Sequence, residues 1–178
     1  IDNDISSTEY CLGVDSALNI IKTSIDSIRD TASSFSRAFV IETMGRDCGF
    51  LALVSALTSG AELCLIPEKE YDLESFEESF KEQIKNGRRY FIAVVAEGIK
   101  DDSQDIARWF EEKIGIESRV SILGHIQRGG NPTIYDRLMA YRFVNNAIDA
   151  LLEGKEESVI CYTKDGFKYK SIDEVVNT

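Results

Sequence analysis

The sequence predicts an α/β fold with three layers, in which a mainly parallel sheet is covered by helices on both faces. Two observations support this prediction. Predicted strands alternate with predicted helices, and each strand is an almost continuous apolar run, which is typical of strands buried on both faces. Polar groups then follow the carboxyl ends of several strands, where ligands of open α/β sheets bind. We therefore expect one core and a shared ligand cleft.

The first half of the chain contains two helix and strand pairs. Apolar residues recur at helical spacing from Val14 to Ile28, which predicts a helix with caps at Ser6–Thr8 and an end near residues 29–30. A polar break at Ser33 and Ser34 then leads to an apolar strand at 38–41. After a glycine turn we expect an apolar helix at 50–57, capped by Ser59 and Gly60, and a strand at 62–66 that Pro67 stops.

The second half continues the alternation. An acidic amphipathic pattern predicts a helix at 73–84 before the turn Asn86-Gly87, and an apolar run predicts a strand at 90–96. Apolar spacing that includes Trp109 indicates a core-packed helix at 103–114, and a further strand follows at 119–123. The remaining expected elements are a long helix from Thr133 to about Leu151, a strand at 158–162 and a short helix at 172–176.

Composition excludes several classes of protein. A net charge of −11 argues against a nucleic-acid or membrane surface, since both require a basic face. No apolar run approaches the ~18 residues of a membrane helix, and no signal peptide opens the chain. The four cysteines lack Cys-x-x-Cys spacing, which predicts reduced, buried thiols and a cytoplasmic location. The chain begins with Ile1, so we expect it to be part of a longer protein.

The segment 119–130 is the most informative stretch of the chain. It contains the only histidine, His125, between Arg119 and Arg128, together with three glycines. Two guanidiniums, an imidazole and flexible backbone predict a site for an anionic ligand such as a phosphate. Taken alone, the histidine is more often structural and the Gly129-Gly130 pair is more often only a turn.

Four segments in one order resemble the 6-phosphofructokinases: IDND (1–4), ETMGRDCG (42–49), IPE (66–68) and LGHIQRGGNP (123–132). The resemblance covers nearly the whole chain. It implies transfer of the γ-phosphoryl group of ATP to the 1-hydroxyl of fructose 6-phosphate, with Mg²⁺, in glycolysis. It also implies a partial enzyme, in which residues 14–125 form a sugar-phosphate domain. Residues 1–13 and 126–178 would belong to a larger domain, with the donor-binding part lying upstream of this chain.

The resemblance assigns roles residue by residue. Asp2 aligns with the catalytic base, Arg46 with the arginine that steadies the transferring group, and Asp4 with a position near magnesium. Phosphoryl transfer needs one such carboxylate, and the rest is positioning and charge neutralisation. The remaining residues expected to contact substrate are Ile1, Met44, Gly45, Glu97, His125, Ile126, Gln127 and Arg128.

Two further arginines, Arg37 and Arg119, match residues that reach the sugar phosphate from a neighbouring subunit, which implies a homotetramer with shared sites. Plainer interpretations exist for several site residues. Asp2 could be a turn or cap residue, Glu97 a salt-bridged carboxylate at a strand end, and Arg37 a solvated charge.

A second site is implied at residues that match an effector pocket for ADP or phosphoenolpyruvate. These residues are Arg29, Gly60, Ala61, Glu62, Arg88, Arg89 and Tyr90. Asn86 departs from the family pattern, because a lysine is often found there, and its absence removes one positive charge from the pocket. The plain alternative is that Arg88 and Arg89 form a solvated turn.

Two other functions remain open. The chain could be a sugar-phosphate-sensing, regulatory subunit without activity, or part of a pyrophosphate-dependent enzyme of the same fold. Asp2 favours catalysis, since a sensor has no use for a base, and the segment 48–50 resembles ATP-dependent members. We expect the isolated chain to be inactive, because the donor loop lies outside it.

Overall fold

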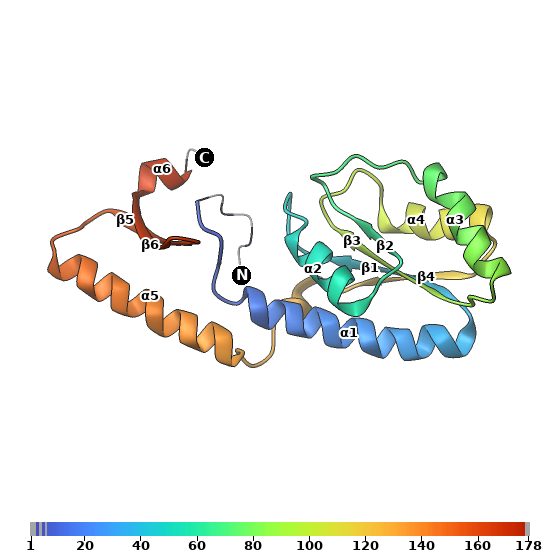
Figure 1. Cartoon of the computed structure of the whole chain (residues 1–178), viewed down its shortest axis with the longest axis horizontal. Helices are drawn as coiled ribbons and strands as arrows, with labels where there is room; N and C mark the ends of the chain where they lie inside the picture. The colour runs from blue at the N-terminus through green and yellow to red at the C-terminus, as the bar shows by residue number, and fades with distance from the viewer. Residues whose placement is uncertain (1–2, 4, 6, 177–178) are drawn as a thin grey trace.

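A computed structural model describes residues 3, 5 and 7–176, and within them a four-stranded parallel sheet has the order β2-β3-β1-β4 (Figure 1). The strands are β1 (Ala38–Thr43), β2 (Leu63–Leu65), β3 (Phe91–Ala96) and β4 (Ser118–Ile122). Ala38 pairs with Phe91 on one side and with Ser118 on the other, so β1 lies inside the sheet. The predicted mainly parallel sheet is confirmed.

Helices cover both faces of this sheet, as predicted. Side chains alternate along β1, so Val40 and Ile41 point to opposite faces. On one face lie α1 (Val14–Phe35) and α2 (Phe50–Ser59), and on the other lie α3 (Glu74–Lys85), α4 (Ser103–Trp109) and the π-helical turn η1 (Phe110–Ile114). Trp109 packs edge-on against Phe80 in the second core, which agrees with the expected packing role.

Helix α1 differs from the prediction at both ends. It continues to Phe35, because the hydroxyls of Ser33 and Ser34 donate to the carbonyl of Asp30 at 2.9 Å and are compatible with the helix. The expected end at 29–30 and polar break were therefore wrong. Thr8 does not cap the helix either, since its hydroxyl donates to the carbonyls of Tyr10 and Tyr162. Ser6 lies outside the described residues.

The C-terminal part forms a separate lobe beside the sheet (Figure 1). It contains α5 (Ile134–Leu152), an antiparallel hairpin of β5 (Ser158–Thr163) and β6 (Gly166–Ser171), and α6 (Ile172–Val176). The strand expected at 158–162 exists, but it does not join the parallel sheet, and the strand at 166–171 was missed. Phe167 and Tyr169 contact α5, which makes the hairpin a cover for one side of that helix.

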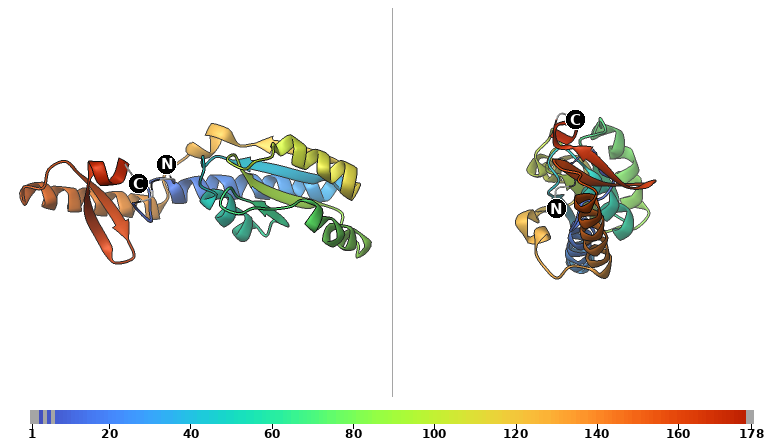
Figure 2. Two further views of the ribbon diagram at one scale, coloured as in Figure 1. Left: turned by 90° about the horizontal axis from the view of Figure 1, so that it is seen from above. Right: turned by 90° about the vertical axis from the view of Figure 1, so that its left-hand side faces the viewer.

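The other side of α5 is exposed along its whole length, and Figure 2 shows the helix extending away from the sheet lobe. A contiguous apolar surface of this kind marks a place where another segment or molecule binds. Its exposed apolar residues are Ile134, Tyr135, Leu138, Tyr141, Val144, Ile148, Leu151 and Leu152.

A buried carboxylate joins the two lobes. Asp136, in the first turn of α5, accepts hydrogen bonds from the Tyr10 hydroxyl at 2.6 Å, from Gly13 N–H at 2.7 Å and from Ser16 N–H at 2.8 Å. Gly13 has no side chain, so Asp136 acts as the cap of α1 and places a negative charge at the positive end of that helix. Burial raises the pKa of Asp136, but the hydrogen bonds from Ser16, Tyr10 and Gly13 outweigh it and the pKa is lowered.

Replacing Asp136 by Asn is expected to lower the free energy of unfolding of the chain by about 2–3 kcal/mol, because buried N–H groups would face an amide N–H. Urea denaturation measures this loss, and Asp149→Asn, an exposed carboxylate on the same helix, is the control. Since the folded pKa of Asp136 is lowered, its contribution is present above the ordinary aspartate pKa of about 3.9 and is lost as the pH falls below it. A difference between wild type and variant that persists unchanged in acid would contradict this assignment.

The cysteines are free thiols in the described part of the chain, as expected, but only Cys161 is buried. Cys11, Cys48 and Cys64 are partly exposed, so the prediction of burial was wrong for these three. Burial of the Cys64 sulfur still raises its pKa to about 11, which keeps this thiol protonated at neutral pH. Among the residues that the structure describes, no helix is long and apolar enough to cross a membrane.

Candidate active site

Three loops meet at the carboxyl end of the sheet, as predicted. Because β1 lies between β3 and β4, the loops that leave these strands are neighbours. They carry Met44–Arg46 after β1, Glu97 after β3, and a 3₁₀ helix, η2 (Gly124–Arg128), after β4. The backbone connects them, since Glu97 N–H donates to Thr43 O at 2.9 Å and Leu123 N–H donates to Glu42 O at 3.0 Å.

The loop between β1 and α2 is held by side chains from three other loops. Gln127 accepts from Met44 N–H at 3.0 Å and donates to Met44 O at 3.4 Å. One carboxylate oxygen of Glu97 accepts from the N–H groups of Gly45 and Arg46, at 2.9 and 2.7 Å. Glu68, which follows β2, accepts from Gly49 N–H at 2.8 Å at the start of α2. The backbone that carries Arg46 is therefore held by hydrogen bonds from outside the loop.

Arg46 adopts an unusual backbone conformation at the centre of this loop. Its φ of 51° lies in the left-handed region, which costs energy for a residue with a side chain and is common at functional sites. The chain after β3 approaches closely, because a Cβ at Gly98 would lie 2.2 Å from the Arg46 carbonyl oxygen. Glycine at position 98 is thus required for the contact between these two loops.

The residues of η2 divide into two groups. Gln127 is only 1% exposed and its amide is bonded to Met44, so its side chain positions the loop instead of facing solvent. His125, Ile126 and Arg128 are exposed on the same short helix. All four residues were predicted to contact substrate, and the supporting roles of Gln127 and Glu68 were not predicted. In the sequence, these roles were indicated only by the presence of polar side chains in the segments 66–68 and 123–132, which does not distinguish a supporting residue from a ligand contact.

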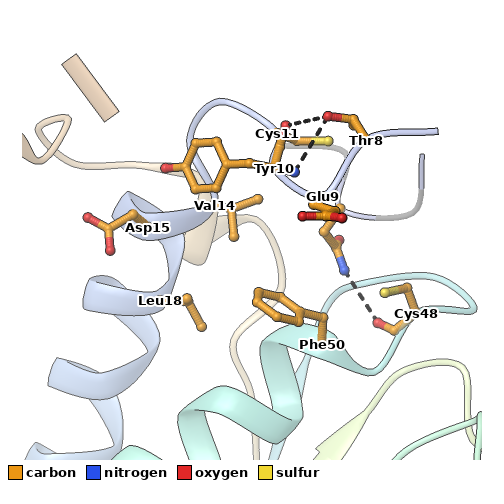
Figure 3. Close-up of a pocket in the computed structure, with 10 residues that line it drawn as sticks. Thr8, Glu9, Tyr10, Cys11, Val14, Asp15, Leu18, Cys48 and Phe50 are labelled. Carbon is orange, nitrogen blue, oxygen red and sulfur yellow. Dashed lines mark hydrogen bonds between the residues drawn. The ribbon is translucent and has the colours of Figure 1, made fainter. Parts of the chain in front are cut away.

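The N-terminal segment contacts the same loop. The side-chain amide of Asn3 donates to Cys48 O at 3.4 Å. Beside this contact lies a cavity of about 250 Å³ with the apolar side chains of Val14, Leu18 and Phe50 in its wall (Figure 3). No arginine, lysine or histidine is among its described lining residues, so they offer a phosphate no cationic side chain. The predicted residues Ile1, Asp2 and Asp4 lie outside the described residues.

Arg37 and Arg119 lie together at the opposite end of the sheet. Arg37 precedes β1, and Arg119 is the second residue of β4, where it pairs with Phe39. Both guanidiniums bind the carboxylate of Glu117, with Arg37 Nε donating to Glu117 Oε2 at 2.7 Å and Arg119 Nη2 donating to Oε1. Arg37 is thus ion-paired, which differs from the solvated charge considered above. The structure does not bring these arginines to the loops of His125 and Arg128 within one chain.

The residues predicted to bind an effector also gather at this amino end. Arg29 donates to the carbonyls of Ser59 and Gly60, at 2.5 and 3.3 Å. Arg88 forms an ion pair with Glu62, whose side chain is 6% exposed and also accepts from Ile92 N–H at 2.7 Å. The alternative of a solvated turn is therefore wrong for Arg88. Arg89 is exposed, whereas Tyr90 packs against the core of α1 and α2.

Comparison with known proteins identifies the family. The model of the phosphofructokinase family matches residues 1–151. An ATP-dependent 6-phosphofructokinase of Sulfurimonas denitrificans is 73% identical over 177 residues, which cover 99% of this chain and 56% of that protein. A second protein of that name, from a Sulfurovum species, is 65% identical over 98% of this chain and 53% of its own length.

Solved structures agree with this result. The phosphofructokinase of Saccharomyces cerevisiae superimposes with a TM-score of 0.89 at 34% identity, covering 99% of this chain and 25% of that chain. The chain studied here spans about half the length of the curated relatives that it matches. Sequence and fold lead to the same conclusion: this chain belongs to the phosphofructokinase family.

Proposed function

We propose that this chain is the acceptor-binding half of an ATP-dependent 6-phosphofructokinase, a cytoplasmic enzyme of glycolysis. The observation that carries the proposal is the convergence of Arg46, Glu97 and η2 at one edge of the sheet, with the Arg46 loop held from three sides. Such preorganisation is what phosphoryl transfer requires, because most of its catalysis is positioning and charge neutralisation. The names of the bacterial relatives support ATP as the donor.

In this proposal the 1-hydroxyl of fructose 6-phosphate attacks the γ-phosphorus of ATP, its proton passes to Asp2, and ADP leaves. Arg46 neutralises the charge of the transferring group, while His125 and Arg128 bind the sugar phosphate. Glu97 has a second carboxylate oxygen besides the one that holds the loop, and this oxygen accepts a hydrogen bond from a sugar hydroxyl. Met44, Gly45 and the backbone of Ile126 line the sugar.

We assign the binding of magnesium and ATP mainly to the part of the family's proteins that this chain does not cover. Among residues 3, 5 and 7–176, no three histidine, cysteine or carboxylate side chains gather as metal ligands. The described residues therefore form no metal site by themselves, and Asp4 is proposed only as one neighbour of the ion. When bound, magnesium would neutralise charge on the donor phosphates.

The test uses the parent protein. By this we mean the polypeptide or complex that contains this chain together with the remaining part of a full-length phosphofructokinase. Purified parent should phosphorylate fructose 6-phosphate with ATP, measured as formation of fructose 1,6-bisphosphate. Activity with pyrophosphate and not with ATP would favour the pyrophosphate-dependent alternative. Tight binding of fructose 6-phosphate without turnover with either donor would favour the regulatory subunit and reject the proposal.

We also propose that residues 14–125 form the sugar-phosphate domain, and that residues 1–13 and 126–178 belong to a larger domain completed by the other half. The exposed apolar face of α5 supports this division, since a partner must cover it. Hydrogen exchange along α5 should be slower in the parent than in this chain. Equal exchange rates in both would contradict the proposed domain arrangement.

Effector binding at the amino end of the sheet is the third part of the proposal. Arg29, Gly60, Ala61, Glu62, Arg88, Arg89 and Tyr90 would bind ADP or phosphoenolpyruvate in a homotetramer. Replacing Arg88 by Ala in the parent should change the response to these effectors several-fold while effector-free kinetics remain nearly unchanged. Arg88→Lys keeps a positive charge beside the buried Glu62 and separates loss of binding from loss of fold. Arg108→Ala, an exposed arginine paired with Asp105, is the control.

If the concentration dependence of both effectors is the same in Arg88→Ala and wild type, Arg88 does not contact the effector. Its role is then to neutralise Glu62, which precedes β2 and accepts a hydrogen bond from Ile92 N–H in β3.

A further inference from the structure

One carboxylate at the amino end of the sheet binds two arginines at once. The oxygens of Glu117 are used separately, since Oε2 accepts from Arg37 Nε at 2.7 Å and Oε1 accepts from Arg119 Nη2. The backbone holds this arrangement in register, because Ala38 N–H donates to Glu117 O at 2.9 Å and Ala38 pairs with Ser118. The two guanidiniums are therefore brought to one point by neighbouring strands.

The two arginines are also the most suitable anion-binding groups at this point. A guanidinium binds phosphate through parallel N–H groups, and Glu117 occupies N–H groups that such a contact would use. Their side chains are 29% exposed for Arg37 and 49% for Arg119, so solvent reaches both. Part of Arg119 is fixed independently, since its Nη1 donates to Ser118 O at 2.7 Å.

Glu117 itself is able to leave. Its side chain is 46% exposed, and its neighbours Ile116 and Ser118 are buried, so the carboxylate can rotate into solvent while the strand ends stay in place. It is also charged at neutral pH. The hydrogen bond from Arg37, opposed by a smaller effect of desolvation and reinforced by Arg119, holds the Glu117 pKa below its ordinary value.

We propose that Glu117 is an internal competitor for phosphate: it occupies Arg37 and Arg119, and a phosphate monoester binds by displacing it. The inference rests on the proposed function, together with the resemblance that matches Arg37 and Arg119 to residues reaching the sugar phosphate from a neighbouring subunit. It goes further in naming a residue that weakens this contact. Glu117 then sets the concentration at which the substrate's phosphate group binds to the two arginines. When no phosphate is present, Glu117 remains ion-paired with them.

The experiment titrates inorganic phosphate into the 178-residue chain at low ionic strength, and follows the side-chain Nε–Hε signals of Arg37 and Arg119 by NMR. Wild type is compared with Glu117→Gln and Glu117→Ala. The control is Glu111→Gln, which removes a carboxylate 4.0 Å from Arg119 that is hydrogen-bonded to neither guanidinium. Arg119→Ala tests whether phosphate binds at this pair at all.

The expected result is a phosphate Kd lower by about two- to tenfold in both Glu117 variants, the range that follows from releasing exposed ion pairs. Glu111→Gln should change the Kd much less, and Arg119→Ala should abolish the response. An unchanged or higher Kd in the Glu117 variants would mean that Glu117 orients the arginines, which overturns the proposal. An equal decrease in Glu111→Gln would reduce the effect to net charge and overturn it too, as would the lack of any phosphate response in the Glu117 variants.

This titration needs neither ATP nor turnover, so it fails independently of the proposed function. Tighter phosphate binding in Glu117→Gln together with an inactive parent would reject the proposed catalytic activity and keep Glu117 as the competitor. If the parent is active but the Glu117 variants of the 178-residue chain bind phosphate no more tightly than wild type, only the competitor role of Glu117 is rejected.

Discussion

The replacement of Asp2 by serine in the parent protein is expected to lower kcat by roughly 10²–10⁴-fold, the usual range for loss of a positioned general base. In the proposed mechanism the KM for fructose 6-phosphate should change far less, because Asp2 would accept the proton of the attacking hydroxyl while other residues bind the sugar phosphate. Steady-state kinetics with ATP in excess measure both constants. Asp2 itself lies outside the described residues, but its neighbour Asn3 contacts the loop that carries Arg46.

The matched control is Asp26→Ser, which removes a half-exposed carboxylate paired with Lys22 on α1 and not among the residues proposed to bind substrate. It should leave both constants near wild type. A large rise in KM with kcat intact for Asp2→Ser would make Asp2 a binding residue and leave the parent without an identified base.

Mixing two inactive parent variants, Asp2→Ala and Arg119→Ala, is expected to restore activity once subunits have exchanged. If each acceptor site takes Asp2 from one subunit and Arg119 from its neighbour, a mixed dimer contains one site with both changes and one site with neither. Up to half of the sites in the mixed dimer would then be active. This is a large gain over either variant alone, since neither is expected to show measurable turnover. The test is an activity assay after subunit exchange, which mass spectrometry verifies.

The geometry is the reason for expecting a neighbouring subunit in this site. Arg119 is the second residue of β4 and His125 lies in η2 beyond its end; the three strand steps from Arg119 to Ile122 alone span roughly 10 Å, and the Arg119 guanidinium is bound to Glu117 at the amino end. One phosphate cannot contact both within one chain, whereas a two-fold axis can place the amino end of one sheet opposite the carboxyl end of another. No recovery of activity despite verified exchange would mean that each subunit builds its own site and that Arg119 serves the fold.

The features that could be predicted from the sequence are those set by local patterns. Strands such as β1 and β3 are apolar runs of ordinary length, and the parallel order places their carboxyl ends at one edge. The meeting of Arg46, Glu97 and η2 followed from this rule alone. The predicted end of α1 was wrong because a serine does not always break a helix. Its hydroxyl can instead donate to a backbone carbonyl in the preceding turn, as Ser33 and Ser34 do.

The unpredicted features depend on partners that are distant in the sequence. Asp136 is 120 residues away from Ser16, and no pattern in either segment indicates that one caps the other. The same holds for Gln127 and Glu68, whose acceptor atoms could equally have faced a ligand. Strand β6, and with it the β5–β6 hairpin, was missed because β6 alternates half-buried and exposed residues and lacks the continuous apolar run of the central strands.

The strand order β2-β3-β1-β4 has a consequence for how the nascent chain folds during synthesis. The first two strands of this sheet to be made, β1 and β2, are not neighbours, because β3 lies between them. Until Phe91–Ala96 has emerged from the ribosome, the apolar strand β1 has no native strand to pair with on either edge, and its unpaired backbone is open to wrong partners. A chain stalled before Phe91 thus holds two strands that cannot pair with each other, whereas a chain extended beyond Ala96 can close three strands at once.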